Sequence, residues 1–130
     1  MKILFASDIH GSAYYCRRLL DIYKETKASR MVILGDILYH GPRNDLPKEY
    51  APKEVIAMLN PLKDQIYAVR GNCDTEVDQM VRQFPILADY ALLVLDGKTF
   101  YATHGHVFNQ DHLPPMQAGD ILVHGHTHLL

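Results

Sequence analysis

Short blocks of apolar residues, each followed by a similar group of small and polar residues, recur five times along this chain. The blocks are rich in Val, Ile, Leu and Tyr and are short, so they predict buried β-strands. Each leads into a glycine with Asp, Asn or His beside it, and glycine permits the sharp turns expected at strand ends. The blocks are residues 2–7, 31–34, 66–69, 99–103 and 121–123, and the polar residues that follow are Asp8 and His10, Asp36, Asn72 and Asp74, His104 and His106, and His126 and His128.

The segments between the first three strands carry a helical pattern. Residues 12–27 place apolar side chains at helical spacing with charged residues between them, and Gly11-Ser12 offers a helix start. A second helix is predicted over residues 52–60, with Pro52 near its start, and a short one over residues 76–82. Strand, helix and strand in succession predict a βαβ unit with parallel strands.

The second half of the chain departs from this alternation. Residues 90–95 and 98–103 flank Asp96-Gly97, a strong signal for a two-residue turn, and therefore predict an antiparallel hairpin. If His104 is to reach Asp8, its strand must run the same way as the first strand or belong to a second, facing sheet. We therefore predict an α/β fold, a four-layer αββα sandwich in which the second sheet is incomplete because the chain ends early.

Composition bounds the class of protein. The chain has 130 residues, 48% apolar and 22% charged, which suits one soluble globular domain over residues 1–130. A formal net charge of -2 without a long basic run argues against a general nucleic-acid-binding surface. The two cysteines lie far apart outside any CxxC pattern, and no segment suits a signal peptide or a membrane span. We expect a cytoplasmic protein without disulfides.

The five motifs would bring three Asp, one Asn and five His side chains together if their strand ends share one edge. So many carboxylates and imidazoles are difficult to crowd together without a cation. Asp8 and His10 are two residues apart, so at an extended strand end they would lie on the same side. A carboxylate oxygen combined with an imidazole nitrogen suits Mn, Fe or Zn better than Ca. The sequence therefore predicts a metal-dependent enzyme.

Taken together, these motifs resemble the signature of the calcineurin-like metallophosphoesterases over the whole chain. Residues 40–44, 70–74 and 78–80 are most similar to the bacterial YfcE-type phosphodiesterases within that superfamily. The resemblance implies two metal ions that share one carboxylate. One would be held by Asp8, His10, Asp36 and His128, and the other by Asp36, Asn72, His104 and His126.

The resemblance also implies a reaction, the metal-assisted hydrolysis of a small phosphodiester. Two divalent cations roughly 3.5–4 Å apart would share a water, lower its pKa and bind the phosphate oxygens. We expect Mn²⁺, with Zn²⁺, Fe²⁺ or Ni²⁺ as alternatives. The residues expected to take part in catalysis are Asp36, Asn72, His104 and His106.

Cys73 departs from the wider superfamily, many of whose members have His at this position. A thiol is a poorer general acid and cannot carry a positive charge, so the change favours diesters or activated aryl esters over demanding monoesters. We expect Cys73 to border the substrate as a small side chain. Its role as a nucleophile is disfavoured because a metal hydroxide already fills that role.

Further residues have two interpretations each. His106 could touch the phosphate or donate a proton, or it could orient a ligand. Arg43 lies in a long loop after Asp36 and could pair with a phosphate oxygen, or it could be a solvated turn residue. We expect Asp74 to hydrogen-bond a neighbouring ligand or loop amide rather than to bind metal.

Three other readings stay open. The enzyme could be a phosphomonoesterase or a nuclease of the same superfamily, and a non-catalytic binding scaffold on the same fold is a rival of another class. Family members usually continue beyond the position of His128, so the chain could be partial or its second sheet completed by another subunit. An unpaired sheet edge would favour a homo-oligomer.

Overall fold

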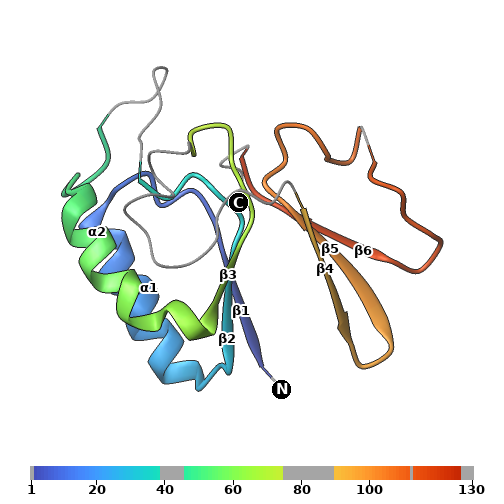
Figure 1. Cartoon of the computed structure of the whole chain (residues 1–130), viewed down its shortest axis with the longest axis horizontal. Helices are drawn as coiled ribbons and strands as arrows, with labels where there is room; N and C mark the ends of the chain where they lie inside the picture. The colour runs from blue at the N-terminus through green and yellow to red at the C-terminus, as the bar shows by residue number, and fades with distance from the viewer. Residues whose placement is uncertain (1, 39–45, 75–89, 112, 127–130) are drawn as a thin grey trace.

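The computed structural model describes residues 2–38, 46–74, 90–111 and 113–126. They form two three-stranded sheets, with the helices against the first. Figure 1 shows the helices on one side of this first sheet and the second sheet on the other. These layers confirm a mixed α/β fold with two sheets. Within the described ranges, no helix is long and apolar enough to cross a membrane.

The first sheet is parallel and has the order β1-β2-β3. Its strands are β1 (Ile3–Ala6), β2 (Arg30–Ile33) and β3 (Ile66–Ala68). β1 and β3 are shorter than the apolar blocks that predicted them, whereas β2 has the predicted length and begins one residue earlier. Helix α1 (Ala13–Thr26) joins the first two strands, and the predicted βαβ unit is confirmed. Helix α2 (Pro52–Leu59) and the 3₁₀ segment η1 (Asn60–Gln65) lead into β3.

Local sequence explains where α1 begins and ends. The Ser12 hydroxyl accepts a hydrogen bond from the Tyr15 backbone N–H at 3.2 Å, which satisfies one of the free donors of the first turn. Lys27 ends the helix in the left-handed region, with φ of 55°. The predicted start at Ser12 is therefore confirmed. The predicted helix over residues 76–82 lies outside the described residues.

The second sheet has the order β4-β5-β6. Strands β4 (Tyr90–Leu95) and β5 (Lys98–Thr103) form the predicted antiparallel hairpin, and Asp96 and Gly97 both have positive φ, as a type I′ turn requires. Strand β6 (Ile121–His124) is parallel to β5 and pairs Thr103 with His124. The parallel pairing brings the ends of β5 and β6 to the same edge of their sheet.

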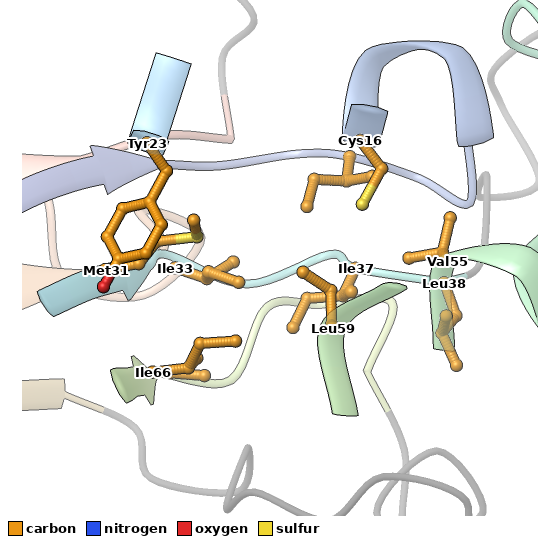
Figure 2. Close-up of a cluster of buried hydrophobic side chains, with 11 residues drawn as sticks. Cys16, Tyr23, Met31, Ile33, Ile37, Leu38, Val55, Leu59 and Ile66 are labelled. Carbon is orange, nitrogen blue, oxygen red and sulfur yellow. The ribbon is translucent and has the colours of Figure 1, made fainter. Parts of the chain in front are cut away.

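Two buried clusters hold the layers together, and β2 contributes to both. Met31 and Ile33 point toward the helices, whereas the intervening Val32 faces the second sheet. Among the described residues, eleven are buried in the helix-side core, and Figure 2 shows α1 and α2 residues such as Tyr23 and Leu59 packed over the sheet. The inter-sheet core has four, namely Val32, Leu34, Val69 and Ala102. A strand buried on both faces explains the continuous apolar run from Met31 to Leu34.

Candidate metal centre

The polar residues after the strands come together where the two sheets meet. Four of them, Asp8, His10, Asp36 and His126, adopt the left-handed backbone region, with φ of 58°, 51°, 55° and 74°. Residues other than glycine rarely adopt this conformation, and it concentrates at functional sites. The expectation that Asp8 and His10 continue an extended strand was wrong, because β1 ends at Ala6. Turning the backbone brings their side chains together nonetheless.

Asp74 braces the loops that follow β2 and β3. Its carboxylate is buried and accepts three backbone hydrogen bonds, from Asp36 N at 2.8 Å, Ile37 N at 3.1 Å and Gly71 N at 2.9 Å. In return, the Asp36 Oδ1 atom accepts a hydrogen bond from the Cys73 N–H at 2.8 Å. The prediction that Asp74 binds loop amides is confirmed. These bonds support the unusual backbone conformation of Asp36.

Two of the motif glycines are required by close approach rather than by a turn. A Cβ atom on Gly71 would lie 2.2 Å from the Asp36 Oδ1 atom. A Cβ atom on Gly125 would lie 2.6 Å from Asp8 Oδ2, on the side where the His126 N–H donates to that oxygen at 2.9 Å. A side chain at either position would therefore push the polar residues apart.

His104 lies at the centre of the site and is fully buried. Its Nδ1 atom is 2.7 Å from the Leu34 carbonyl, an acceptor, so Nδ1 carries the proton and Nε2 of the neutral ring carries a lone pair. That Nε2 atom is 3.0 Å from Asp36 Oδ2, 2.9 Å from Asn72 Oδ1 and 3.0 Å from His126 Nδ1. Four potential ligand atoms thus converge at one point of the site. Oxygen and imidazole nitrogen are a donor set that suits a transition metal or zinc.

A second group of ligand atoms lies beside the first and shares Asp36 with it. The His10 Nε2 atom is 3.2 Å from Asp8 Oδ1 and 3.6 Å from Asp36 Oδ2. Asp36 Oδ2 therefore lies between the imidazoles of His10 and His104, and Asp8 Oδ1 is 3.8 Å from His104 Nε2. A carboxylate in this position is suited to bridge two cations. We refer to Asp8, His10, Asp36, Asn72, His104 and His126 as the metal centre.

The pKa values of Asp8 and His104 are both shifted in the direction that favours the charged side chain. Burial opposes ionisation of Asp8, but hydrogen bonds from His10, Ser7 and the His126 N–H hold its pKa well below the usual value. Burial also opposes a charge on His104, yet hydrogen bonding to Asp36 and the charges of Asp36 and Asp8 raise its pKa. The carboxylates that attract a proton to His104 would equally attract a metal cation.

Cys73 lies against the metal centre and is almost completely buried. Burial and the neighbouring Asp36 and Asp74 carboxylates raise the pKa of its thiol to about 12, so it remains protonated at neutral pH. A protonated thiol supports the view that Cys73 is not a nucleophile. Its sulfur can also be grouped with the ligand atoms of His10 and Asp36, all within 4.8 Å of one another.

His106 extends from the metal centre into solvent. Its ring is 5.3 Å from that of His104 and 6.2 Å from that of His126, measured between centroids. Partial burial, followed by the nearby imidazoles of His104 and His126, lowers its pKa, so the ring is neutral at neutral pH. His106 is therefore within reach of a bound substrate but makes no direct bond to Asp36.

A cavity of about 210 Å³ adjoins the metal centre, and sequence reasoning missed it. His126 and His106 belong to its lining, together with Gly105, Asn109, Gln110, Asp111 and His124. Residues 109–111 follow no strand directly and match no motif, so only the fold reveals their position. His124 was expected to be a packed or capping residue; it is half-buried, lies 3.1 Å through Nδ1 from the Gly125 carbonyl oxygen and lines this cavity.

Two predicted site residues, Arg43 and His128, lie outside the described residues. The structure brings together the other six predicted metal ligands, and it places Cys73 and His106 beside them. Both cysteines, Cys16 and Cys73, are free and buried.

Fold and site together define a phosphoesterase of the calcineurin-like class. The family model of the calcineurin-like phosphoesterase superfamily domain matches residues 1–130, and the chain belongs to this family. The family resemblance expected from the five strand-end motifs is thereby confirmed.

Individual relatives agree with this assignment. The chain is 50% identical over 129 residues to phosphodiesterase YfcE of Escherichia coli K12, a match covering 99% of this chain and 70% of that protein. The solved structure of the E. coli phosphoesterase YfcE superposes with a TM-score of 0.96 at 49% identity, covering 98% of this chain and 70% of that one. A phosphodiesterase of Methanocaldococcus jannaschii, MJ0936, is 26% identical over 98% of this chain and 74% of its own length.

Proposed function

We propose that this protein hydrolyses a small phosphodiester with the help of two divalent metal ions, and that the metal is Mn²⁺. The observation that carries the proposal is the convergence of imidazole nitrogen atoms on Asp36 Oδ2, with His104 on one side and His10 on the other. The 50% identity to the E. coli phosphodiesterase YfcE supports the choice of reaction.

The residues that fit the two ions are those of the metal centre. Asp8, His10 and Asp36, with His128 from outside the described residues, would hold one ion. Asp36, Asn72, His104 and His126 would hold the other. Such a pair of cations lowers the pKa of a bound water and neutralises charge on the phosphate oxygens.

The protein itself contributes orientation and control of protons. The Leu34 carbonyl fixes the Nδ1–H tautomer of His104 and so keeps its Nε2 lone pair directed into the centre. Asp74 holds the backbone of Asp36 and Ile37 through buried hydrogen bonds. His106, a solvent-accessible imidazole that its lowered pKa keeps neutral, is suited to contact the phosphate through its ring N–H rather than to protonate the departing oxygen.

A diester is favoured over a monoester because of Cys73. Its thiol stays neutral and cannot supply the positive charge that would help to bind a dianionic phosphate. A diester carries one negative charge on its phosphate and needs less compensation. Two cations held by the residues of the metal centre would supply this compensation.

A substrate panel tests this proposal. Chelator-treated protein should be inactive, and Mn²⁺ should restore hydrolysis of bis(4-nitrophenyl) phosphate more strongly than of 4-nitrophenyl phosphate or of single-stranded DNA. Metal analysis of the active protein should give two ions per chain. A preference for the monoester or for DNA would replace the diesterase assignment with one of its rivals. Absence of both metal binding and turnover would favour a binding scaffold.

A further inference from the structure

The cavity beside the metal centre is built by the loop that follows β5. Thr103 Oγ1 donates to the Phe108 carbonyl at 3.0 Å and accepts from the Gly105 N–H at 3.1 Å. Asn109 Nδ2 donates to the Gly105 carbonyl at 2.9 Å, while its Oδ1 accepts from the Asp111 N–H at 2.9 Å. Because these bonds fold the loop back on itself, the cavity wall is formed before any ligand binds.

Gly105 keeps the cavity open at its inner end. Its φ is 112°, and a Cβ atom there would lie 2.8 Å from the Gly125 carbonyl oxygen and 3.0 Å from His124 Nδ1. The β5 and β6 ends can therefore approach each other only with glycine at this position. This approach places His124 and His126 on the same wall of the cavity.

The cavity suits one small organic group. Its volume of about 210 Å³ is below the roughly 300–1,000 Å³ typical of sites for drug-sized ligands. His126 belongs both to the metal centre and to the lining, so a group attached to a phosphate at the centre would enter the cavity directly.

Apart from Gly105, the lining residues have polar side chains, although carbon atoms make up more than half of the lining surface. Gln110 can donate and accept hydrogen bonds, as can the imidazoles of the wall. Among the lining residues, Asp111 alone bears a carboxylate, and it lies at the exposed rim. Because Asp111 is exposed, its carboxylate stays hydrated. It can still repel an anion that enters the cavity, and salt should weaken this repulsion.

We propose that this cavity holds one ester group of the phosphodiester, and that Asp111 makes it select small uncharged or cationic groups with hydrogen-bonding atoms over anionic ones. The proposal rests on the phosphodiesterase function above and adds the class of ester group. The metal centre attracts the anionic phosphate, whereas the adjoining cavity rejects a second anion. The metal centre would attract the phosphate and Asp111 would repel an anionic ester group. Together they would orient a substrate whose only negative charge is on the phosphate.

Two isosteric substrates test the proposal, bis(4-carbamoylphenyl) phosphate with neutral amides and bis(4-carboxyphenyl) phosphate with carboxylates. The measured quantity is the ratio of kcat/KM for the carboxylate to that for the amide, with Mn²⁺-loaded protein. Asp111→Asn should raise this ratio about threefold to tenfold, and Asp111→Lys should raise it further. The increase should shrink at high salt, because screening weakens the repulsion in the wild type. The two esters differ in intrinsic reactivity, but this difference is the same for every variant. It therefore cancels when the ratio is compared between variants.

Asp96→Asn is the matched control. It removes the same charge from the tip of the β4–β5 hairpin, where Asn-Gly is as suitable a turn as Asp-Gly. Its ratio should equal that of the wild type. An equal ratio in Asp111→Asn, Asp111→Lys and the control, with diester turnover intact, would overturn the cavity assignment and leave the proposed function standing.

A binding measurement separates the two proposals without turnover. Calorimetric titration of metal-loaded protein with 4-carbamoylphenyl phosphate and 4-carboxyphenyl phosphate should give the same dependence on Asp111. If neither diester is hydrolysed but this binding preference appears, the cavity assignment survives as a binding site while the diesterase function fails. If neither turnover nor a charge-dependent binding preference appears, both proposals are wrong.

Discussion

The two sheets contribute to the metal centre in different ways. On the first sheet, the loops after β2 and β3 are tied together by four buried hydrogen bonds that involve the carboxylates of Asp74 and Asp36. On the second sheet, His104 and His126 are each attached to the first by a bond to Leu34 or Asp8. In the part of the chain that the structure describes, the first sheet also carries the larger core, with eleven buried residues against four between the sheets.

This difference indicates which part of the molecule sets the geometry of the site. The carboxylates of Asp36 and Asp74 lie on the loops after β2 and β3, which their hydrogen bonds hold together; we call these loops the frame. The imidazoles of the second sheet are positioned by hydrogen bonds to groups of the first sheet. Disturbing the frame should therefore affect every ligand, whereas loosening the second sheet should act more gradually. The following predictions test this contrast.

The largest effect is expected at Asp36, the carboxylate shared by both groups of ligands. Asp36→Asn keeps an oxygen that can accept the Cys73 N–H but removes the negative charge between the imidazoles of His10 and His104. Diesterase kcat should fall by roughly 10³-fold, as when a major electrostatic contact is lost from an active site. Far-UV circular dichroism should be unchanged and bound metal reduced. Retained activity in this variant would show that Asp36 is not the bridge.

The next effect is expected at Asp74, which contacts no substrate but holds the frame. Asp74→Asn replaces one acceptor oxygen by an amide NH₂ that faces a backbone N–H, and an unsatisfied buried pair of this kind costs about 1–3 kcal/mol. Misplacement of Asp36 should also lower metal affinity roughly 10–100-fold. Denaturant unfolding and metal titration measure the two effects.

Asp120→Asn is the control for this variant. Asp120 Oδ2 accepts a single, exposed hydrogen bond from the Gln117 N–H, which Asn can also accept. Its stability should change by less than about 0.5 kcal/mol. Equal effects of the two substitutions would mean that Asp74 is an ordinary loop residue.

The two cores should differ in their sensitivity to truncation. Leu59 on α2 is buried to 1% exposure, and Leu59→Ala should cost about 2–5 kcal/mol of unfolding free energy. Leu93 on β4 is only half-buried between the sheets, so Leu93→Ala should cost about 1–2 kcal/mol. Leu92 is 53% exposed on the opposite face, and Leu92→Ala should cost no more than about 0.5 kcal/mol. Urea denaturation gives all three values; a larger loss at Leu93 than at Leu59 would reverse the contrast.

The smallest effect is expected from pH on the metal-free protein. The pKa of Asp8 is lowered in the folded state, so its contribution to stability is present above its ordinary value of about 4 and is lost as pH falls further. The pKa of His104 is raised, so its contribution is present below about 6.5 and is lost as pH rises through the higher folded value. The Tm of chelator-treated protein should therefore fall by a few degrees between pH 6 and pH 8.5.

Mn²⁺ should reverse this trend, because metal binding competes with protons for the imidazoles and strengthens as pH rises. His104→Asn should weaken the alkaline fall of the metal-free protein. A metal-free Tm that instead rises across this range would contradict the raised pKa of His104. Differential scanning calorimetry with and without metal makes both comparisons.

Much of the fold could be predicted because it depends on local signals. The apolar blocks became strands, Ser12 capped α1, and Asp96-Gly97 formed the expected turn. The two-sheet arrangement followed from a geometric requirement, that His104 and Asp8 meet. The residues of the metal centre could be predicted to lie together because each is in a short segment that follows a strand and contains a glycine.

The fold alone decided other features, since they depend on contacts between distant residues. The left-handed backbone of Asp8, His10 and Asp36 was not predicted, and the Asp74 bonds that support Asp36 cross 38 residues of chain. No single-sequence pattern specifies such a partner. The same holds for the cavity of residues 105, 106, 109–111, 124 and 126, two of whose segments meet through the parallel pairing of β5 and β6.

The sequence by itself determined which chemistry is present: strands that end in carboxylates, an amide and imidazoles, with glycines where the chain must pack closely. Those choices are local, because strand propensity, turn type and ligand identity belong to short segments. The tertiary structure decided how the chemistry is arranged: Asp36 between two imidazoles, the tautomer of His104 set by Leu34, and Asp111 at the rim of a neighbouring cavity. Such properties arise only when segments from two sheets meet, because distance and burial, rather than residue type, govern charge and hydrogen bonding there.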